Sequence, residues 1–154
     1  MFKKILLTLI LLFSTTLFAS NSIYKVSIKK DFRSALHSIK KTLEDQNLYI
    51  ISKADISGTL ERMKGKLGKA YNKRGYEKAQ SIIFCNPFYA NDVMNEDPDM
   101  MALCPLKIMI MTKKGTTTAL FVLPSKLAGN SPARKTLLEV ENRVKVALKK
   151  AGYR

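Results

Sequence analysis

The sequence predicts an α+β fold, a two-layer sandwich in which helices pack on one face of a largely antiparallel sheet. Three observations predict it: segments with strand periodicity alternate with segments of helical periodicity, two β-rich runs form a hairpin, and a long amphipathic helix ends the chain. No internal repeat and no Pro/Gly/Ser-rich linker divides the sequence. We therefore expect one domain over residues 20–154.

The first half of this domain is predicted to run strand, helix, strand, helix. Residues 23–28 alternate apolar and polar side chains, which is the period of a half-buried strand. A helix is expected between Asp31, a candidate N-cap, and Asn47, a candidate stop before a second strand over residues 48–52. A second helix is expected over residues 59–68. Its apolar stripe is Leu60, Met63 and Leu67.

The second half adds a buried strand, a hairpin and two helices. The short apolar run of residues 80–84 is typical of a buried strand, and a brief helix over residues 89–95 follows the turn at Asn86 and Pro87. Two β-rich runs, 106–112 and 117–123, are joined through Lys113, Lys114 and Gly115 and predict antiparallel neighbours. Ser131 and Pro132 are expected to start the long terminal helix, which Gly152 ends.

Residues 1–19 have the composition of a secretory signal peptide. Lys3 and Lys4 precede an apolar run from Ile5 to Phe13, and the small residue Ala19 stands before a polar start. The apolar run is shorter than the roughly 18 residues needed to span a bilayer. We therefore expect the segment to be removed and the mature chain to be exported without spanning the membrane, to the periplasm rather than fully secreted.

The charge of the chain favours anionic partners. Loss of Lys3 and Lys4 with the signal peptide lowers the formal net charge from +15 to +13. Because no nucleic-acid-binding motif is recognisable and export removes the chain from chromosomal DNA, no nucleic-acid partner is expected. Anionic small molecules, lipid head groups and envelope polymers remain as candidates.

A basic segment is the main functional lead. Seven cations fall within 17 residues, from Arg62 to Lys78. Arg62, Lys66 and Lys69 recur at intervals of four and three, so they are expected on one helix face. The candidate ligand-binding residues are Arg62, Lys66, Lys69, Tyr71, Lys73 and Arg74. Cations would hold phosphates or carboxylates, and the tyrosine would contact an apolar part of the ligand. A plain solvated face is the alternative.

Cys85 and Cys104 are the two cysteines, 19 positions apart. In an exported protein an even pair favours a structural disulfide. A redox-active pair and two packed free thiols are the alternatives. The spacing differs from the two-residue interval of thiol oxidoreductases.

No set of residues indicates catalysis, a cofactor or a metal. His37 is the one histidine, and no nucleophile elbow accompanies it. Met109 and Met111 could suggest a copper site, but they alternate with Ile108 and Ile110 in a strand whose two faces are expected to be covered. We therefore expect core packing there, no cofactor and no metal.

Four short motifs suggest a family. They are Cys85-Asn86-Pro87, Tyr89-Ala90-Asn91, Asp97-Pro98-Asp99 and Leu103-Cys104-Pro105. Together with the helix after Asp31 they make the chain resemble the domain of unknown function 302 family over nearly all of its mature length. The resemblance implies an α/β sandwich that often forms a homodimer, and it implies no reaction.

The sequence thus predicts an exported, noncatalytic binding domain that takes an anionic small ligand, a lipid or an envelope polymer on its basic segment. A thiol-disulfide redox protein using Cys85 and Cys104 is one alternative. A purely structural envelope protein is the other.

Overall fold

The computed structural model describes residues 22–154, so the predicted signal peptide lies outside the described residues. Its elements are β1 (Ile23–Ile28), α1 (Phe32–Glu44), β2 (Tyr49–Asp55), α2 (Ile56–Arg62), α3 (Lys64–Leu67), η1 (Gly68–Ala70), β3 (Lys78–Cys85), α4 (Pro87–Glu96), η2 (Pro98–Leu103), β4 (Leu106–Lys113), β5 (Thr116–Val122), α5 (Pro124–Leu127) and α6 (Arg134–Lys150). In this part of the chain, no helix combines the length and the apolar character needed to cross a membrane.

The strands form one antiparallel sheet in the order β1-β5-β4-β3-β2. The predicted hairpin is confirmed as β4 and β5, joined by Lys114 and Gly115 with φ of 49° and 70°. A two-residue hairpin turn of type I′ needs positive φ at both positions, and glycine adopts it without steric cost. The hairpin places β5 where it can also pair with β1.

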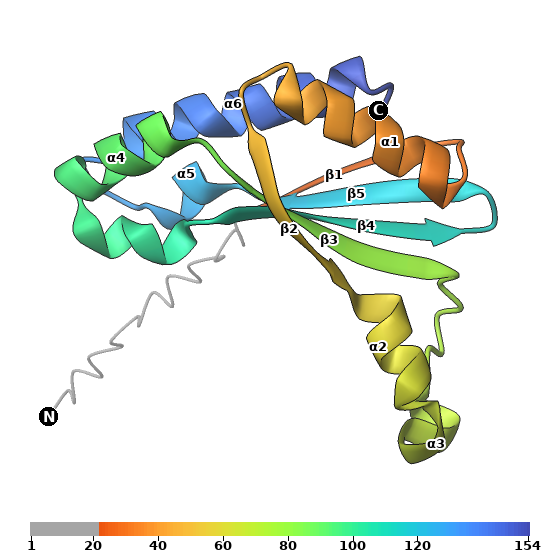
Figure 1. Cartoon of the computed structure of the whole chain (residues 1–154). Helices are drawn as coiled ribbons and strands as arrows, with labels where there is room; N and C mark the ends of the chain where they lie inside the picture. Colours follow the sequence, from red (N-terminus) through yellow and green to blue (C-terminus); the bar gives the residue numbers. More distant parts are fainter. Residues whose placement is uncertain (1–21) are drawn as a thin grey trace, which may run out of the picture.

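Helices α1, α4 and α6 lie on one face of the sheet (Figure 1). The side chains that alternate toward this face, among them Ile82, Phe84, Ile108, Ile110 and Phe121, are 0–1 % exposed and form the core. The α+β sandwich with helices on one face is therefore confirmed. The main hydrophobic core therefore lies between this face of the sheet and the helices.

Among residues 22–154, no α-helical layer covers the opposite face of the sheet, which corrects the expectation that both faces of β4 are covered (Figure 1). Met109 and Met111 alternate with the buried isoleucines of β4, and Leu120 pairs with Met109 from β5. All three side chains are half-buried. We call this surface the open face.

Local sequence signals set most ends of the helices and strands, but the start of the terminal helix differs from the prediction. Asp31 caps α1 by accepting a hydrogen bond from the Ser34 amide at 3.0 Å, as predicted. The terminal helix begins at Arg134 and not at Ser131, because the Ser131 hydroxyl accepts from the Ala133 amide and closes a turn before the helix. The short elements η2 and α5 were not predicted.

Candidate functional site

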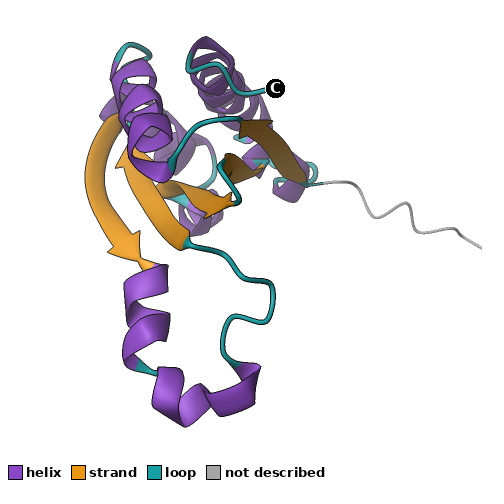
Figure 2. Cartoon of the chain, turned by 90° about the vertical axis from the view of Figure 1, so that its right-hand side faces the viewer, coloured by secondary structure: helices purple, strands orange, loops and turns teal. Residues whose placement is uncertain are grey.

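Residues 56–77, which we call the arm, connect β2 to β3 by way of α2, α3 and η1. The arm projects from one end of the sheet, away from α1 and α6 (Figures 1 and 2). None of its residues belongs to either hydrophobic core cluster. The basic segment predicted from the sequence therefore lies on a projection that the core does not need.

The predicted helix over residues 59–68 is wrong in its bounds and in its continuity. It starts earlier because the Asp55 carboxylate caps α2, accepting from the Gly58 amide at 2.9 Å. A Cβ at Gly58 would lie 2.4 Å from that carboxylate, so glycine permits the close cap. The helix breaks at Met63, whose φ and ψ are −95° and 1°. Leu60, Met63 and Leu67 each expose more than a third of their surface instead of forming a buried stripe.

A polar cluster holds the outer part of the arm together. The Tyr71 hydroxyl donates to one oxygen of Glu61, and the Lys64 ammonium lies 3.4 Å from the other. The same ammonium lies 5.2 Å from the centroid of the Tyr71 ring. The hydrogen bond from Tyr71 lowers the pKa of Glu61, and the same bond raises the pKa of Tyr71. Glu61 is therefore an ionised carboxylate whose charge Lys64 balances.

The return segment of the arm, residues 72–77, is hydrogen-bonded to the β4–β5 hairpin. The Asn72 side chain exchanges two hydrogen bonds with the backbone of Tyr76, at 2.8 and 3.0 Å. The Lys114 amide donates to Glu77 at 2.8 Å, and the Lys113 ammonium donates to the carbonyl of Arg74. These contacts fix where the arm re-enters the sheet.

The structure gathers all six predicted ligand-binding residues on the arm, but not on one helix face. Five of them are cations with exposed side chains: Arg62, Lys66, Lys69, Lys73 and Arg74. Within residues 22–154, none of the five has a carboxylate within 4.0 Å. The sixth, Tyr71, is half-buried, and its hydroxyl is already bonded to Glu61. The arm thus presents uncompensated positive charge to solvent.

A hollow of about 470 Å³ lies between the arm and the open face. The arm contributes Leu60, Tyr71 and Tyr76, and the sheet contributes Met109 and Met111. Met109 and Met111 were not predicted as site residues, because both faces of their strand were expected to be covered. The alternation of Met109 and Met111 with Ile108 and Ile110 was the sequence signal that the two methionines share one face of the strand.

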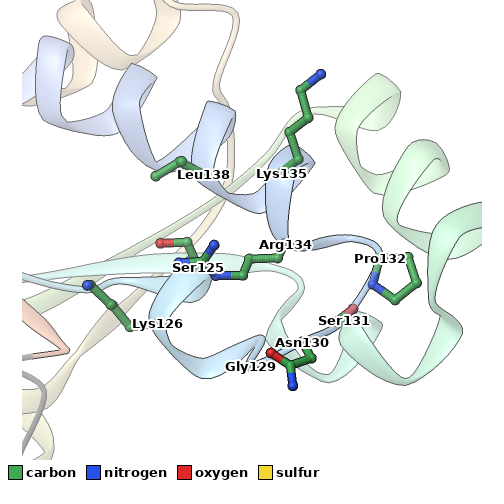
Figure 3. Close-up of a pocket in the computed structure, with 9 residues that line it drawn as sticks. All are labelled: Ser125, Lys126, Gly129, Asn130, Ser131, Pro132, Arg134, Lys135 and Leu138. Atoms are coloured by element: carbon green, nitrogen blue, oxygen red, sulfur yellow. The ribbon is translucent and has the colours of Figure 1, made fainter.

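A second hollow, of about 810 Å³, lies between α5 and the start of α6 (Figure 3). Its cations are Lys126, Arg134 and Lys135, none of which has a carboxylate within 4.0 Å in the described part of the chain. Arg134 extends toward Ser125, whereas Lys135 points away from it (Figure 3). This hollow has no aromatic or methionine lining, and its apolar side chains are Pro132 and Leu138.

Cys85 and Cys104 are free thiols, so the predicted disulfide is corrected. Cys85 is the last residue of β3, and Cys104 lies between η2 and β4. Both line a cavity of about 20 Å³ beneath α4, which has room for about one water molecule. Burial, together with the neighbouring Cys85, raises the pKa of Cys104. A raised pKa disfavours the thiolate that redox chemistry needs.

Among residues 22–154, no group of three or more His, Cys, Asp or Glu side chains is placed to hold a metal ion. His37 is exposed on α1.

Comparison with known proteins gives a family and a fold. The family described as "Domain of unknown function DUF302" matches residues 24–151. The crystal structure of an uncharacterized conserved DUF302 protein from Bacillus stearothermophilus is similar, with a TM-score of 0.73 and 19 % identity over 84 % of this chain and 98 % of that chain. No curated protein matches. The match over residues 24–151 covers α1, α6 and all five strands except Ile23 of β1, and the chain belongs to the DUF302 family.

Proposed function

We propose that this chain is a noncatalytic binding domain that holds an anionic ligand on the arm. The observation that carries the proposal is the set of five exposed arm cations that have no carboxylate within 4.0 Å among residues 22–154. Uncompensated charge of one sign on a projection attracts ligands of the opposite sign, and attraction weakens as salt screens it. The net charge of +15 acts in the same direction.

Export is the second part of the proposal. The charge and apolar pattern of residues 1–19 supports removal of a signal peptide and work in the periplasm, where anionic lipids and envelope polymers are available. Cell fractionation followed by N-terminal sequencing tests it. A mature chain starting at Ser20 or Asn21 is expected, and a cytoplasmic chain that retains Met1 would contradict it.

The binding test is a titration with pyrophosphate, followed by amide chemical shifts. Shifts are expected in the arm. Changing Lys66, Lys69 and Lys73 to glutamine should weaken binding about tenfold, because three exposed charge contacts are worth roughly 0.5 kcal/mol each. The fold should not change, because these side chains are exposed and lie outside the core.

The second hollow supplies a matched control. Changing Lys126, Arg134 and Lys135 to glutamine removes the same charge at a distance from the arm. This control variant should bind pyrophosphate nearly as well as the native protein. Loss of binding in the control but not in the arm variant would place the anion site at α5 and α6 and refute the proposal. A protein that binds no anion and only self-associates would instead be a structural envelope protein.

A further inference from the structure

We infer that the ligand is a single-chain anionic amphiphile, with its apolar chain in the hollow between the arm and the open face. The inference rests on the proposed function, since the arm cations would hold the head group. The hollow brings apolar surface from two elements together beside a cation. Met109 and Met111 come from the sheet, Leu60 comes from α2, and Lys78 lies at its edge. This combination fits an apolar chain joined to an anion.

The carboxylates that line the hollow do not oppose such a ligand. Glu61 accepts hydrogen bonds from Tyr71 and Lys64, and Glu77 accepts one from the Lys114 amide. Their hydrogen-bonding capacity is directed at groups of the protein, and the charge of Glu61 is balanced locally. Arg62, Lys66, Lys69, Lys73 and Arg74 have no carboxylate within 4.0 Å among residues 22–154. The local balance therefore favours a ligand with negative charge.

The surface of the hollow also suits a flexible chain. Its volume of about 470 Å³ lies within the range of small-molecule sites. Methionine side chains are unbranched and polarizable, so they adapt to chains of different shape. Tyr71 and Tyr76 present ring surface from the arm, while the Tyr71 hydroxyl stays bonded to Glu61. Because no helical layer of residues 22–154 covers the open face, the apolar chain of the ligand would cover apolar surface that these residues leave accessible.

The experiment is calorimetric titration of the protein with butyl, hexyl and octyl phosphate, each kept below its micelle concentration. Burial of a methylene contributes about 0.8 kcal/mol, so affinity should rise about fourfold per added carbon. The rise from butyl to octyl phosphate is then about 200-fold for a chain that enters fully. Octyl glucoside, which has the same chain and no charge, should bind much more weakly than octyl phosphate.

Two variants and one control test whether the apolar chain of the ligand enters the hollow. Met109→Ala should reduce the gain in affinity with chain length, whereas Leu120→Ala, its cross-strand neighbour outside the hollow, should leave the gain intact. Ala79→Leu fills the hollow without removing a core contact and should also reduce the gain. Equal effects of Met109→Ala and Leu120→Ala in well-folded proteins would overturn the assignment of the hollow.

The inference and the proposed function fail in different ways. If butyl and octyl phosphate bind equally and the Lys66, Lys69 and Lys73 variant still weakens both, the arm binds anions and the hollow takes no chain. If none of the phosphates binds, the proposed function itself is refuted. A concentration-dependent dimer that Met109→Ala dissociates would show that a second copy covers the open face, and this also overturns the inference.

Discussion

Replacing Lys145 by methionine should destabilise the fold through the buried carboxylate of Glu141. Glu141 lies on α6 and is 2 % exposed. Its carboxylate accepts from the Lys145 ammonium at 2.6 Å and from the Ser125 hydroxyl at 2.6 Å. It also accepts from the Ser125 amide at 3.3 Å, a first-turn donor of α5 that has no partner within its own helix. Methionine keeps the aliphatic stem of lysine and removes the charge.

The expected cost follows from what the substitution leaves behind. Breaking a fully buried ion pair costs about 3–5 kcal/mol. Here the Lys145 side chain is 32 % exposed, and both Ser125 donors remain, so the cost should resemble one charge-assisted hydrogen bond. We expect a loss of about 2 kcal/mol in the free energy of unfolding. For a domain of this size that corresponds to a melting temperature lower by roughly 6–10 °C.

Urea denaturation followed by circular dichroism measures this loss as a lower midpoint at an unchanged m-value. Lys149→Met is the matched control, since Lys149 lies one turn further along α6, is exposed and has no carboxylate within 4.0 Å among residues 22–154. Equal stability of Lys145→Met and Lys149→Met would refute the reasoning, because Ser125 alone would then suffice to hold the charge of Glu141.

The pH dependence of stability gives a second readout of the same group. Burial raises the pKa of Glu141, but the hydrogen bonds from Lys145 and Ser125 and the charge of Lys145 outweigh it, so the pKa is lowered from 4.5. A carboxyl whose folded pKa is depressed binds protons more weakly in the folded state. Its stabilisation is present above the unfolded pKa and is lost as pH falls through the folded pKa. The difference between native protein and Glu141→Gln should therefore shrink below about pH 4.5.

Three further predictions concern the core and the thiols. Asn86→Ala removes the cap of α4 and the donor to the Asn47 carbonyl at 2.9 Å, and should lower the urea midpoint by an amount equivalent to about 2 kcal/mol. Tyr153→Phe should raise stability by about 1 kcal/mol, because the buried Tyr153 hydroxyl has no hydrogen-bond partner in the described structure; a loss of stability would contradict this. Without reductant, native protein should titrate two thiols, and alkylation of Cys104 should still accelerate above pH 9, since its pKa is raised from 9.0. Fewer than two free thiols per chain would contradict the expectation that both cysteines are unpaired.

Local signals made much of the fold predictable. The alternation over residues 23–28 and the side-chain cap at Asp31 depend on neighbours in sequence, and β1 and α1 were predicted with their observed starts. The hairpin was predictable for the same reason, because Gly115 supplies a backbone conformation that the turn requires.

The parts that could not be predicted depend on tertiary packing. The apolar spacing of Leu60, Met63 and Leu67 is the same for a buried helix and for an exposed arm. Whether Met109 and Met111 face a helix layer or solvent is decided by where the crossover helices lie, which the period of a strand does not encode. The candidate site was therefore predictable in its charges and not in its apolar wall.

The arm should be removable without loss of the fold, and this tests whether it is a functional addition to a self-sufficient sandwich. Asp55 pairs with Gln80 across β2 and β3, so a four-residue turn containing Asn-Gly can replace residues 56–79, which are the arm and the first two residues of β3. No core residue is lost. Shortening the loop about sixfold lowers its closure cost by about 1.6 kcal/mol, which offsets the lost contacts of the return segment with the β4–β5 hairpin. We expect a cooperative urea transition within about 1 kcal/mol of the native protein, together with complete loss of pyrophosphate binding. An unfolded product would show that the arm stabilises the open face directly. A folded product that still binds pyrophosphate would exclude the arm as the anion site, because every cation proposed to hold the ligand would be gone.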